Sequence, residues 1–489
     1  MKSLAKDTVI YGLSSIVGKF LNWLLVPLYT YRLAQQADYG IVTNLYAWTA
    51  LLLVILTYGM ETGFFRFANQ EGESAGRVYT TAMTSVGFTS LLFAVLCCIF
   101  SQSIATVLGY PEHSEFIALL SVVVAMDAFA CIPFSYLRFK KRPIRFAVLK
   151  LLFVGLNIVL NLFFLVLCPR IQDLSIISSW YDPGYGVGYV FVANILATGI
   201  QTLCLLPAIL AEKYEFSWPL LKQMLKYSLP LLVLGICGIM NQTLDRIIFP
   251  FLYTGTDAQA QLGIYGACFK VAMVMMVFTQ AFRYAYEPFV FAQSKGEDKK
   301  VQYALAMKYY VIFALLIALG MSLYIDLFAL LVSPAYRVGM TVVPLVLLTY
   351  LFQGIYFNLS IWYKLTDRTH WGAILSTIGL VITLVVNIAL VPEISYYGSA
   401  IASFLCYLCV TIVSYIMSQK YFPIDYDNKS MAIYFVLALG LYAIFHFLAP
   451  EGMLLRLLMA TGLLVVYVVI LFRRDFPASS LPVIGRYFR

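Results

Sequence analysis

The amino-acid sequence predicts an all-α, polytopic membrane protein with about 14 transmembrane helices. The chain is 62% hydrophobic and 12% charged, with a mean hydropathy of +0.85, so it could not present a soluble surface. Long apolar stretches also recur along the chain, and each is long enough to cross a hydrocarbon core of about 30 Å as a helix. Strands of a membrane barrel would be shorter and less continuous.

The expected spans follow one another with short connections. They cover residues 8–31, 41–64, 80–102, 116–137, 146–168, 187–211, 227–250, 264–287, 304–329, 340–361, 371–391, 397–418, 430–448 and 452–472. The first stretch has no small-residue cleavage site behind a short apolar region, so it is expected to be a retained helix.

An internal repeat predicts how the spans are organised. Residues 21–41 resemble residues 244–264 without a gap. The identities in this alignment are Leu21, Pro27, Gln36, Ala37, Gly40 and Ile41. Both copies enter the membrane from the same side, which makes them parallel repeats. Shared apolar composition is the alternative source of such a weak repeat.

The repeat and the polar breaks divide the chain into three expected parts. They are two parallel six-helix lobes, 1–212 (helices 1–6) and 213–420 (helices 7–12), and a terminal helix pair with a cytoplasmic tail, 421–489. The polar segment 212–226 is expected to lie on the membrane as a linker between the lobes.

The positive charges predict the orientation. Alternate connections hold most of the 33 Lys and Arg residues, whereas the opposite loops hold only Arg32, Arg170 and Arg337. Because cytoplasmic loops carry the excess of positive charge, both termini are predicted to face the cytoplasm of a bacterial cell, with the chain in its inner membrane. The net charge of +9 is therefore a topology signal and does not indicate nucleic-acid binding.

The reactive residue types do not indicate an enzyme. Cys406 and Cys409 have the spacing of a metal or redox pair but lack a second pair or a nearby His, so they are interpreted as buried thiols. His113, His370 and His446 lie far apart, whereas a membrane polymerase or acyltransferase would need a general base or metal ligands. No catalytic residue, metal or cofactor is expected.

Polar side chains inside the spans predict the substrate site, because intramembrane charge is costly and rarely faces lipid. The predicted cavity residues are Lys19, Asn22, Asn157, Asn161, Asn241, Asp245, Arg246, Lys270 and Arg283. Lys19, Arg246 and Lys270 outnumber Asp245, the one acid at their depth unless Asp127 reaches them, and an excess of cations favours an anionic ligand such as phosphate or pyrophosphate. Hydrogen bonding between helices is the alternative role for each Asn, and for Asp245 beside Arg246.

Three further acids could couple transport to a proton or sodium gradient. They are Glu61, Asp127 and Glu287, and the sequence does not favour one over another.

Several motifs along the chain resemble the Wzx-type polysaccharide flippases, which carry lipid-linked oligosaccharides. They belong to the multidrug/oligosaccharidyl-lipid/polysaccharide exporter superfamily. The motifs are Tyr11-Gly12, Pro27-Leu-Tyr29, Tyr39-Gly40, Gly59-Met-Glu61-Thr-Gly-Phe-Phe-Arg66-Phe, Lys226-Tyr-Ser-Leu-Pro230-Leu, Asp245-Arg246, Gly263-Ile-Tyr265-Gly and Val391-Pro392…Gly398-Ser-Ala400. The turn between Pro392 and Gly398 departs from the family pattern by being longer than its usual Pro-x-Tyr-Gly form.

The resemblance implies a V-shaped pair of lobes around a central cavity that opens alternately to each side. The implied substrate is a polyprenyl-pyrophosphate-linked oligosaccharide, flipped to the outer leaflet for surface polysaccharide such as the O-antigen of lipopolysaccharide. The implied partners are this glycan, the bilayer and the polysaccharide polymerase machinery, with the chain itself a monomer. The alternatives are a cation-coupled multidrug exporter of the same fold and a lipid II flippase. Lys19 stands alone where the lipid II branch has an Arg-rich first helix.

Overall fold

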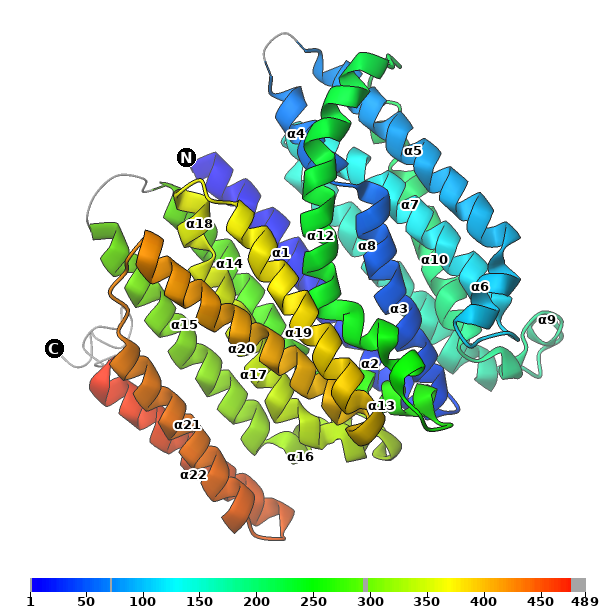
Figure 1. Ribbon diagram of the computed structural model, residues 1–489. Coiled ribbons are helices and arrows are strands. Elements are labelled where there is room, and N and C mark those ends of the chain that lie inside the picture. The colour runs from blue at the N-terminus through cyan, green and yellow to red at the C-terminus, as the bar shows by residue number, and fades with distance from the viewer. Residues whose placement is uncertain (1, 71–72, 293–297, 476–489) are drawn as a thin grey trace. The chain divides into compact units, whose positions relative to one another are not determined.

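The described part of the chain consists of helices and the connections between them. The computed structural model describes residues 2–70, 73–292 and 298–475, and no β-strand occurs within these ranges (Figure 1). The all-α fold class predicted from composition is confirmed.

The chain packs as two compact units. The first consists of Met1–Ala267 and His370–Cys406, and the second of Cys268–Thr369 and Tyr407–Arg489. The boundaries of these two units differ from the boundaries of the three predicted parts. The predicted lobes stay a prediction, because tight packing does not tell which segments move together.

The first unit begins with a long series of helices joined by short turns. They are α1 (Lys2–Trp23), α2 (Leu25–Arg32), α3 (Gln36–Thr57), α4 (Met60–Ala68), α5 (Ala75–Ile99), α6 (Ser101–Val107), α7 (Ser114–Phe139), α8 (Pro143–Leu162), the short turns η1 (Phe163–Leu167) and η2 (Cys168–Arg170), α9 (Ser175–Ser178), η3 (Pro183–Tyr185), α10 (Gly188–Cys204), α11 (Leu206–Ile209) and α12 (Trp218–Leu252). Three more helices complete it: most of α13 (Ala258–Val271), α19 (His370–Ile394) and the first part of α20 (Tyr396–Tyr421).

The second unit contains the remaining helices. They are α14 (Met273–Ala292), α15 (Asp298–Leu323), α16 (Ile325–Phe328), η4 (Ala329–Leu331), η5 (Pro334–Val342), α17 (Val343–Leu359), α18 (Ile361–Leu365), α21 (Asn428–Leu448) and α22 (Met453–Arg474).

The helices establish a multi-pass membrane protein. Among the described residues, 11 helices are long and apolar enough to cross a membrane, and a pair bent by 43°, Ala258–Val271 with Met273–Tyr284, would make a twelfth. The expected first span is divided at Leu24 between α1 and α2, and the expected sixth is shortened to the 17 residues of α10. The total of fourteen spans therefore stays a prediction.

The predicted linker 212–226 includes the start of a long helix, and its expected position on the membrane stays a prediction. The 35-residue helix α12 begins at Trp218, because Pro219 in its first turn has a backbone angle that suits a helix start. The remaining connection is held against α5 and α7, where the Thr80 hydroxyl donates to the Glu215 carbonyl at 2.8 Å. Tyr136 donates to the Glu212 carboxylate at 2.5 Å.

The Tyr136 hydroxyl and the Lys140 ammonium, which lies 3.1 Å from Glu212 Oε1, lower the pKa of the Glu212 carboxyl. This connection is thus anchored to the first unit and is not a loose tether.

A tight helix crossing brings the two copies of the sequence repeat together within the first unit. A Cβ atom at Gly40 of α3 would overlap the carbonyl oxygen of Gln259, and one at Gly263 of α13 would overlap that of Gln36. In the repeat alignment Gly40 corresponds to Gly263, and Gln36 to Gln259, so the two contacts are reciprocal. Reciprocal contacts are what two copies of one segment make around a two-fold axis, which supports an internal duplication.

The second unit is organised around α15, which packs on α14, α17, α21 and α22 (Figure 1). Lys308 of α15 forms ion pairs with Asp427 at 2.8 Å and with Asp475 at 2.5 Å. Tyr434 of α21 donates to Asp475 at 2.6 Å, and Tyr467 of α22 donates to the Ile312 carbonyl at 2.9 Å. The terminal helix pair is thus held to α15 by polar contacts as well as by apolar packing.

Candidate functional site

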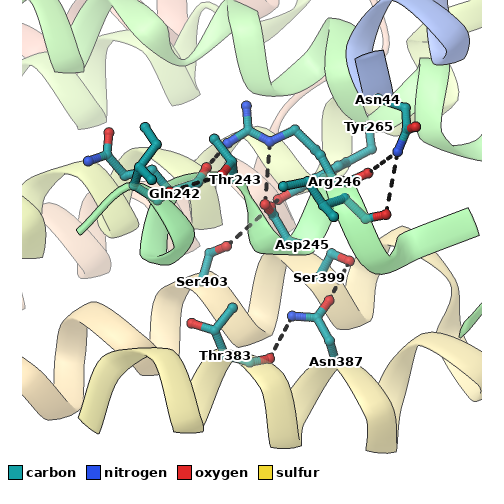
Figure 2. Close-up of polar contacts among 12 residues, drawn as sticks. Asn44, Gln242, Thr243, Asp245, Arg246, Tyr265, Thr383, Asn387, Ser399 and Ser403 are labelled. Carbon is teal, nitrogen blue, oxygen red and sulfur yellow. Dashed lines mark hydrogen bonds and ion pairs between the residues drawn. The ribbon is translucent and has the colours of Figure 1, made fainter. Parts of the chain in front are cut away.

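A buried carboxylate on α12 is the centre of the polar network in the first unit. Asp245 is 2% exposed. Its carboxylate accepts hydrogen bonds from the Tyr265 hydroxyl at 2.7 Å, from Arg246 Nε at 3.3 Å and from the Ser403 hydroxyl at 3.4 Å (Figure 2). A buried charge is costly unless it is paired and hydrogen-bonded, and these three donors meet that requirement. Asp245 therefore joins α12 to α13 and α20.

Arg246 lies beside this carboxylate and is only partly enclosed. Its side chain is 17% exposed and contacts Asp245 Oδ1 through Nε. Its Nη2 donates to the carbonyl of Gln242, one turn earlier on α12 (Figure 2). A guanidinium held by a carboxylate and by its own helix is preorganised, and this group suits two-point contact with phosphate oxygens.

The main chain at Arg246 depends on a residue from another helix. Pro250 has no N–H, so the carbonyl of Arg246, four residues earlier, loses its partner within α12. The Asn44 amide of α3 donates to this carbonyl at 2.6 Å, and the Asn44 oxygen accepts from the Tyr110 hydroxyl at 3.1 Å. Asn44 is 1% exposed. It completes the hydrogen bonding that the proline interrupts.

Replacing Asn44 with leucine should reduce the free energy of unfolding by about 1 kcal/mol, because a buried carbonyl would lose its donor. The same change should cost less in a Pro250→Ala background, where residue 250 regains an N–H for the Arg246 carbonyl. Thermal or denaturant unfolding in detergent measures both values. Asn241→Leu serves as the control, since Asn241 donates to Ser376 and its cost should be the same in both backgrounds. Equal costs of Asn44→Leu in the two backgrounds would contradict this role.

Polar groups of α19 bond the neighbouring helices α12 and α20. Asn241 of α12 donates to the Ser376 carbonyl at 3.0 Å. Asn387, which is fully buried, donates to the Thr383 carbonyl at 2.7 Å and accepts from Ser399 at 2.8 Å (Figure 2). These contacts agree with the alternative that amide and hydroxyl groups act as glue between helices.

The predicted residues of the first and fifth expected spans lie on α1 and α8, which pack against each other. Lys19 and Asn22 are partly buried on α1, and Asn157 and Asn161 are buried on α8. Asn161 donates to the Asn157 carbonyl at 2.7 Å and to its side-chain oxygen at 3.2 Å.

Three amide oxygens of the predicted set are buried without a hydrogen-bond donor. Among the described residues these include Oδ1 of Asn22, of Asn161 and of Asn241. Buried polar atoms are nearly always paired, so unpaired acceptors at predicted substrate positions indicate groups that a donor could satisfy in another conformation.

The two other predicted cations belong to the second unit. Lys270 is partly buried on α13, and the Arg283 guanidinium of α14 lies 5.1 Å from the centre of the Phe357 ring. Nearby, the Tyr310 hydroxyl lies 2.9 Å from that of Thr279, at a place where Gly354 leaves room for it. This part of the second unit combines a cation with aromatic rings and hydroxyl groups.

The three candidate ion-coupling acids have different surroundings. Glu61 of α4 forms an ion pair with Arg138 of α7. Asp127 of α7 interacts electrostatically with Lys150 and with Tyr46, whose hydroxyl accepts from Asn194 of α10 at 2.8 Å. The side chain of the third acid, Glu287, lies outside the described residues.

Sequence reasoning did not place Asn44, Tyr46, Asn194 or Ser403 in the site. A signal was present for two of them, because Thr198 follows Asn194 and Ser399 precedes Ser403 by one turn on the same helix. Pro250 signals that a carbonyl needs a donor, but only the packing of α3 on α12 identifies Asn44 as that donor.

Comparison with known proteins assigns the chain to a family. Residues 4–285 match the polysaccharide biosynthesis protein family, and residues 236–389 match the MatE family. No curated protein sequence gives a significant match.

Among solved structures, the lipid II flippase MurJ in an inward closed conformation has a TM-score of 0.73 at 14% identity, over 96% of this chain and 98% of that chain. An inward-facing multidrug resistance MATE family transporter of the MOP superfamily has a TM-score of 0.68 at 12% identity, over 85% and 97%. A MOP superfamily transporter from Pyrococcus furiosus gives 0.58 at 14% identity, over 85% and 95%. At these identities the structures show a shared fold. The first family match spans more than half of the chain, so the protein belongs to the polysaccharide biosynthesis protein family, and it shares the fold of these solved transporter structures.

Proposed function

We propose that this protein flips a polyprenyl-pyrophosphate-linked oligosaccharide from the cytoplasmic to the outer leaflet by alternating access, for surface polysaccharide synthesis. The observation that carries the proposal is the Arg246 guanidinium, fixed by Asp245 inside the long membrane-spanning helix α12. A fixed guanidinium in a site of low dielectric constant binds phosphate groups strongly. The family match over residues 4–285 supports a role in polysaccharide assembly.

Sugar hydroxyl groups account for the unpaired amide oxygens. Oδ1 of Asn22, Asn161 and Asn241 is closed off from solvent and lacks a donor among the described residues. An unpaired buried acceptor costs about 1–3 kcal/mol, so a conformation that exposes these atoms to hydroxyl donors would gain that energy. The polyprenyl chain needs no polar site, because it can remain in the bilayer.

Coupling to a proton or sodium gradient is part of the proposal. Of the described candidates, Asp127 is the more suitable, since Glu61 is paired with Arg138 near the end of α7. Asp127 lies in the field of Lys150 and Tyr46, so protonation or ion binding there would change the charge balance between α7, α8 and α3.

Both termini should lie in the cytoplasm of the bacterial cell. A reporter that is active only outside the inner membrane should be silent when fused after residue 489 and active when inserted within 251–262, because the basic residues gather on the other side. Protein levels of the fusions, measured by immunoblotting, serve as the control. The reverse pattern would invert the orientation.

Flipping in proteoliposomes tests the function. Purified protein is reconstituted with a fluorescently labelled polyprenyl-pyrophosphate-linked oligosaccharide, and accessibility of the label to an impermeant quencher is followed with time. We expect protein-dependent flipping of this substrate, faster than that of lipid II. Faster flipping of lipid II, or transport of cationic drugs without glycan flipping, would overturn the proposed substrate class.

A further inference from the structure

The first unit contains a sizeable cavity away from the Asp245 network. It has a volume of about 400 Å³ and lies between α3, α5, α6 and α7. Its walls are almost entirely carbon. The Thr49 hydroxyl donates to the Leu45 carbonyl at 2.7 Å and that of Ser121 to the Ala118 carbonyl at 2.8 Å, so these hydroxyls are satisfied within their own helices.

Water is a poor occupant of this cavity. An internal water needs two to four polar partners, and apolar cavities stay dry without them. An empty space would leave the lining side chains without their van der Waals contacts. A volume of about 400 Å³ falls within the range of ligand sites, so the cavity suits an apolar ligand.

The cavity opens sideways toward lipid. Val107 of α6, which lines it, is 72% exposed. On the adjoining α5, Leu96 and Ile99 are 45% and 68% exposed. Exposed apolar side chains on membrane helices contact the hydrocarbon of the bilayer, so the mouth of the cavity meets lipid chains.

The cavity lies within the depth of one leaflet. On α3 its lining runs from Leu45 to Leu52, and on α7 from Ile117 to Val124. Seven residues of helix correspond to about 10 Å, which is about one third of a hydrocarbon core of about 30 Å, so the cavity fits within one leaflet. In the predicted orientation these segments lie in the outer half of the membrane.

We propose that the cavity binds one acyl chain of an outer-leaflet phospholipid. Phospholipids are the bulk of the surrounding bilayer, so they occupy an accessible apolar site by mass action. The bound chain would pack against Trp48, which lines the cavity and also packs on the apolar cluster containing Ile247 of α12. The lipid would thereby support α3 beside the helix that carries Arg246. This proposal does not depend on which glycan is flipped.

A cavity-filling variant tests the site. Ser121→Phe places a ring in the cavity, and Leu92→Phe, on the 48% exposed lipid-facing side of α5, is the matched control. The full-length protein is washed in detergent and its bound phosphatidylethanolamine is counted by native mass spectrometry. We expect one retained phospholipid in the wild type and in Leu92→Phe, and about tenfold less in Ser121→Phe. No retained phospholipid in the wild type, or equal retention in both variants, would overturn the proposal.

Fluorescence locates the bound chain without relying on the filled variant. Phospholipid brominated on one acyl chain should quench the fluorescence of Trp48. The fluorescence of Trp48 is obtained by subtracting the emission of the Trp48→Phe variant from that of the wild type. Quenching should persist after exchange into unlabelled lipid. Loss of this quenching on exchange would contradict the proposal that the cavity retains a bound acyl chain. Displacement of the phospholipid by polyprenyl phosphate at equal mole fraction would assign the cavity to the carrier lipid and overturn the acyl-chain assignment.

Discussion

Replacing Arg246 with alanine should slow flipping of the lipid-linked oligosaccharide about 10- to 100-fold, since a hydrogen bond to a charged group contributes about 1.5–3 kcal/mol. The chain should still fold, because Asn44 bonds the carbonyl of residue 246 and not its side chain, and Asp245 keeps the Tyr265 and Ser403 hydroxyls as donors. Arg246→Lys should retain part of the activity, since it keeps the charge but loses the planar two-point geometry. The measurements are the flipping rate in proteoliposomes and the melting temperature.

Lys222→Ala is the matched control for this prediction. Lys222 is an exposed cation near the start of the same helix, beside the Trp218 ring, and its loss should leave flipping unchanged. A structural role for Arg246 predicts a different pattern. If Asp245→Ala destabilises the protein and adding Arg246→Ala restores its stability, the pair acts only as interhelical glue.

Substituting Gly40 or Gly263 with valine should abolish transport, because either side chain would overlap main-chain atoms of the facing helix. Overpacking of side chains costs about 1–3 kcal/mol, and a main-chain overlap can be relieved only by separating α3 from α13. Cysteines at Gln36 and Gln259, joined by a short bifunctional maleimide, report this crossing. The cross-linking yield should be high in the parent and low in either valine variant.

Gly462→Val on α22 is the control, since a Cβ atom there meets no other atom within 4 Å. It should change neither cross-linking nor transport. The cross-link itself should stop transport if these segments part during the cycle, as alternating access requires. Full activity of the cross-linked protein would contradict that cycle and would favour a fixed groove along which the head group slides.

Composition and span length identified an all-α membrane protein because no other structure satisfies the backbone of such apolar segments in lipid. The count of spans was less certain in the sequence, since α1–α2 and α10–α11 are interrupted, and an apolar run does not show where a helix breaks. The expected seventh span begins at residue 227 whereas α12 begins at Trp218, because a helix can continue through residues that are too polar to count toward a membrane span.

The candidate site was partly visible in the sequence. Asn241 and Asp245 lie one turn apart on one strongly apolar segment, with Arg246 next to Asp245, so their place inside the membrane could be predicted from this spacing and from the cost of intramembrane charge. The residues that contact them could not be predicted from the sequence. Tyr265 and Ser403 lie 20 and 158 residues from Asp245, and no periodic pattern connects side chains across such separations.

The sequence therefore determined which segments lie in the membrane and which groups need a partner, and the tertiary structure decided which residues of other helices are those partners. The sequence alone determined that the chain lies in a membrane and that Gly40 and Gly263 occupy equivalent positions of a repeat. It also determined that Pro250 leaves the Arg246 carbonyl without a donor in its own helix. Only the packing of helices decided that Asn44 supplies that donor and that the repeated glycines meet face to face. The physical reason is that a hydrogen bond or a close crossing depends on distances between helices, whereas burial and helix formation depend on the residues within one segment.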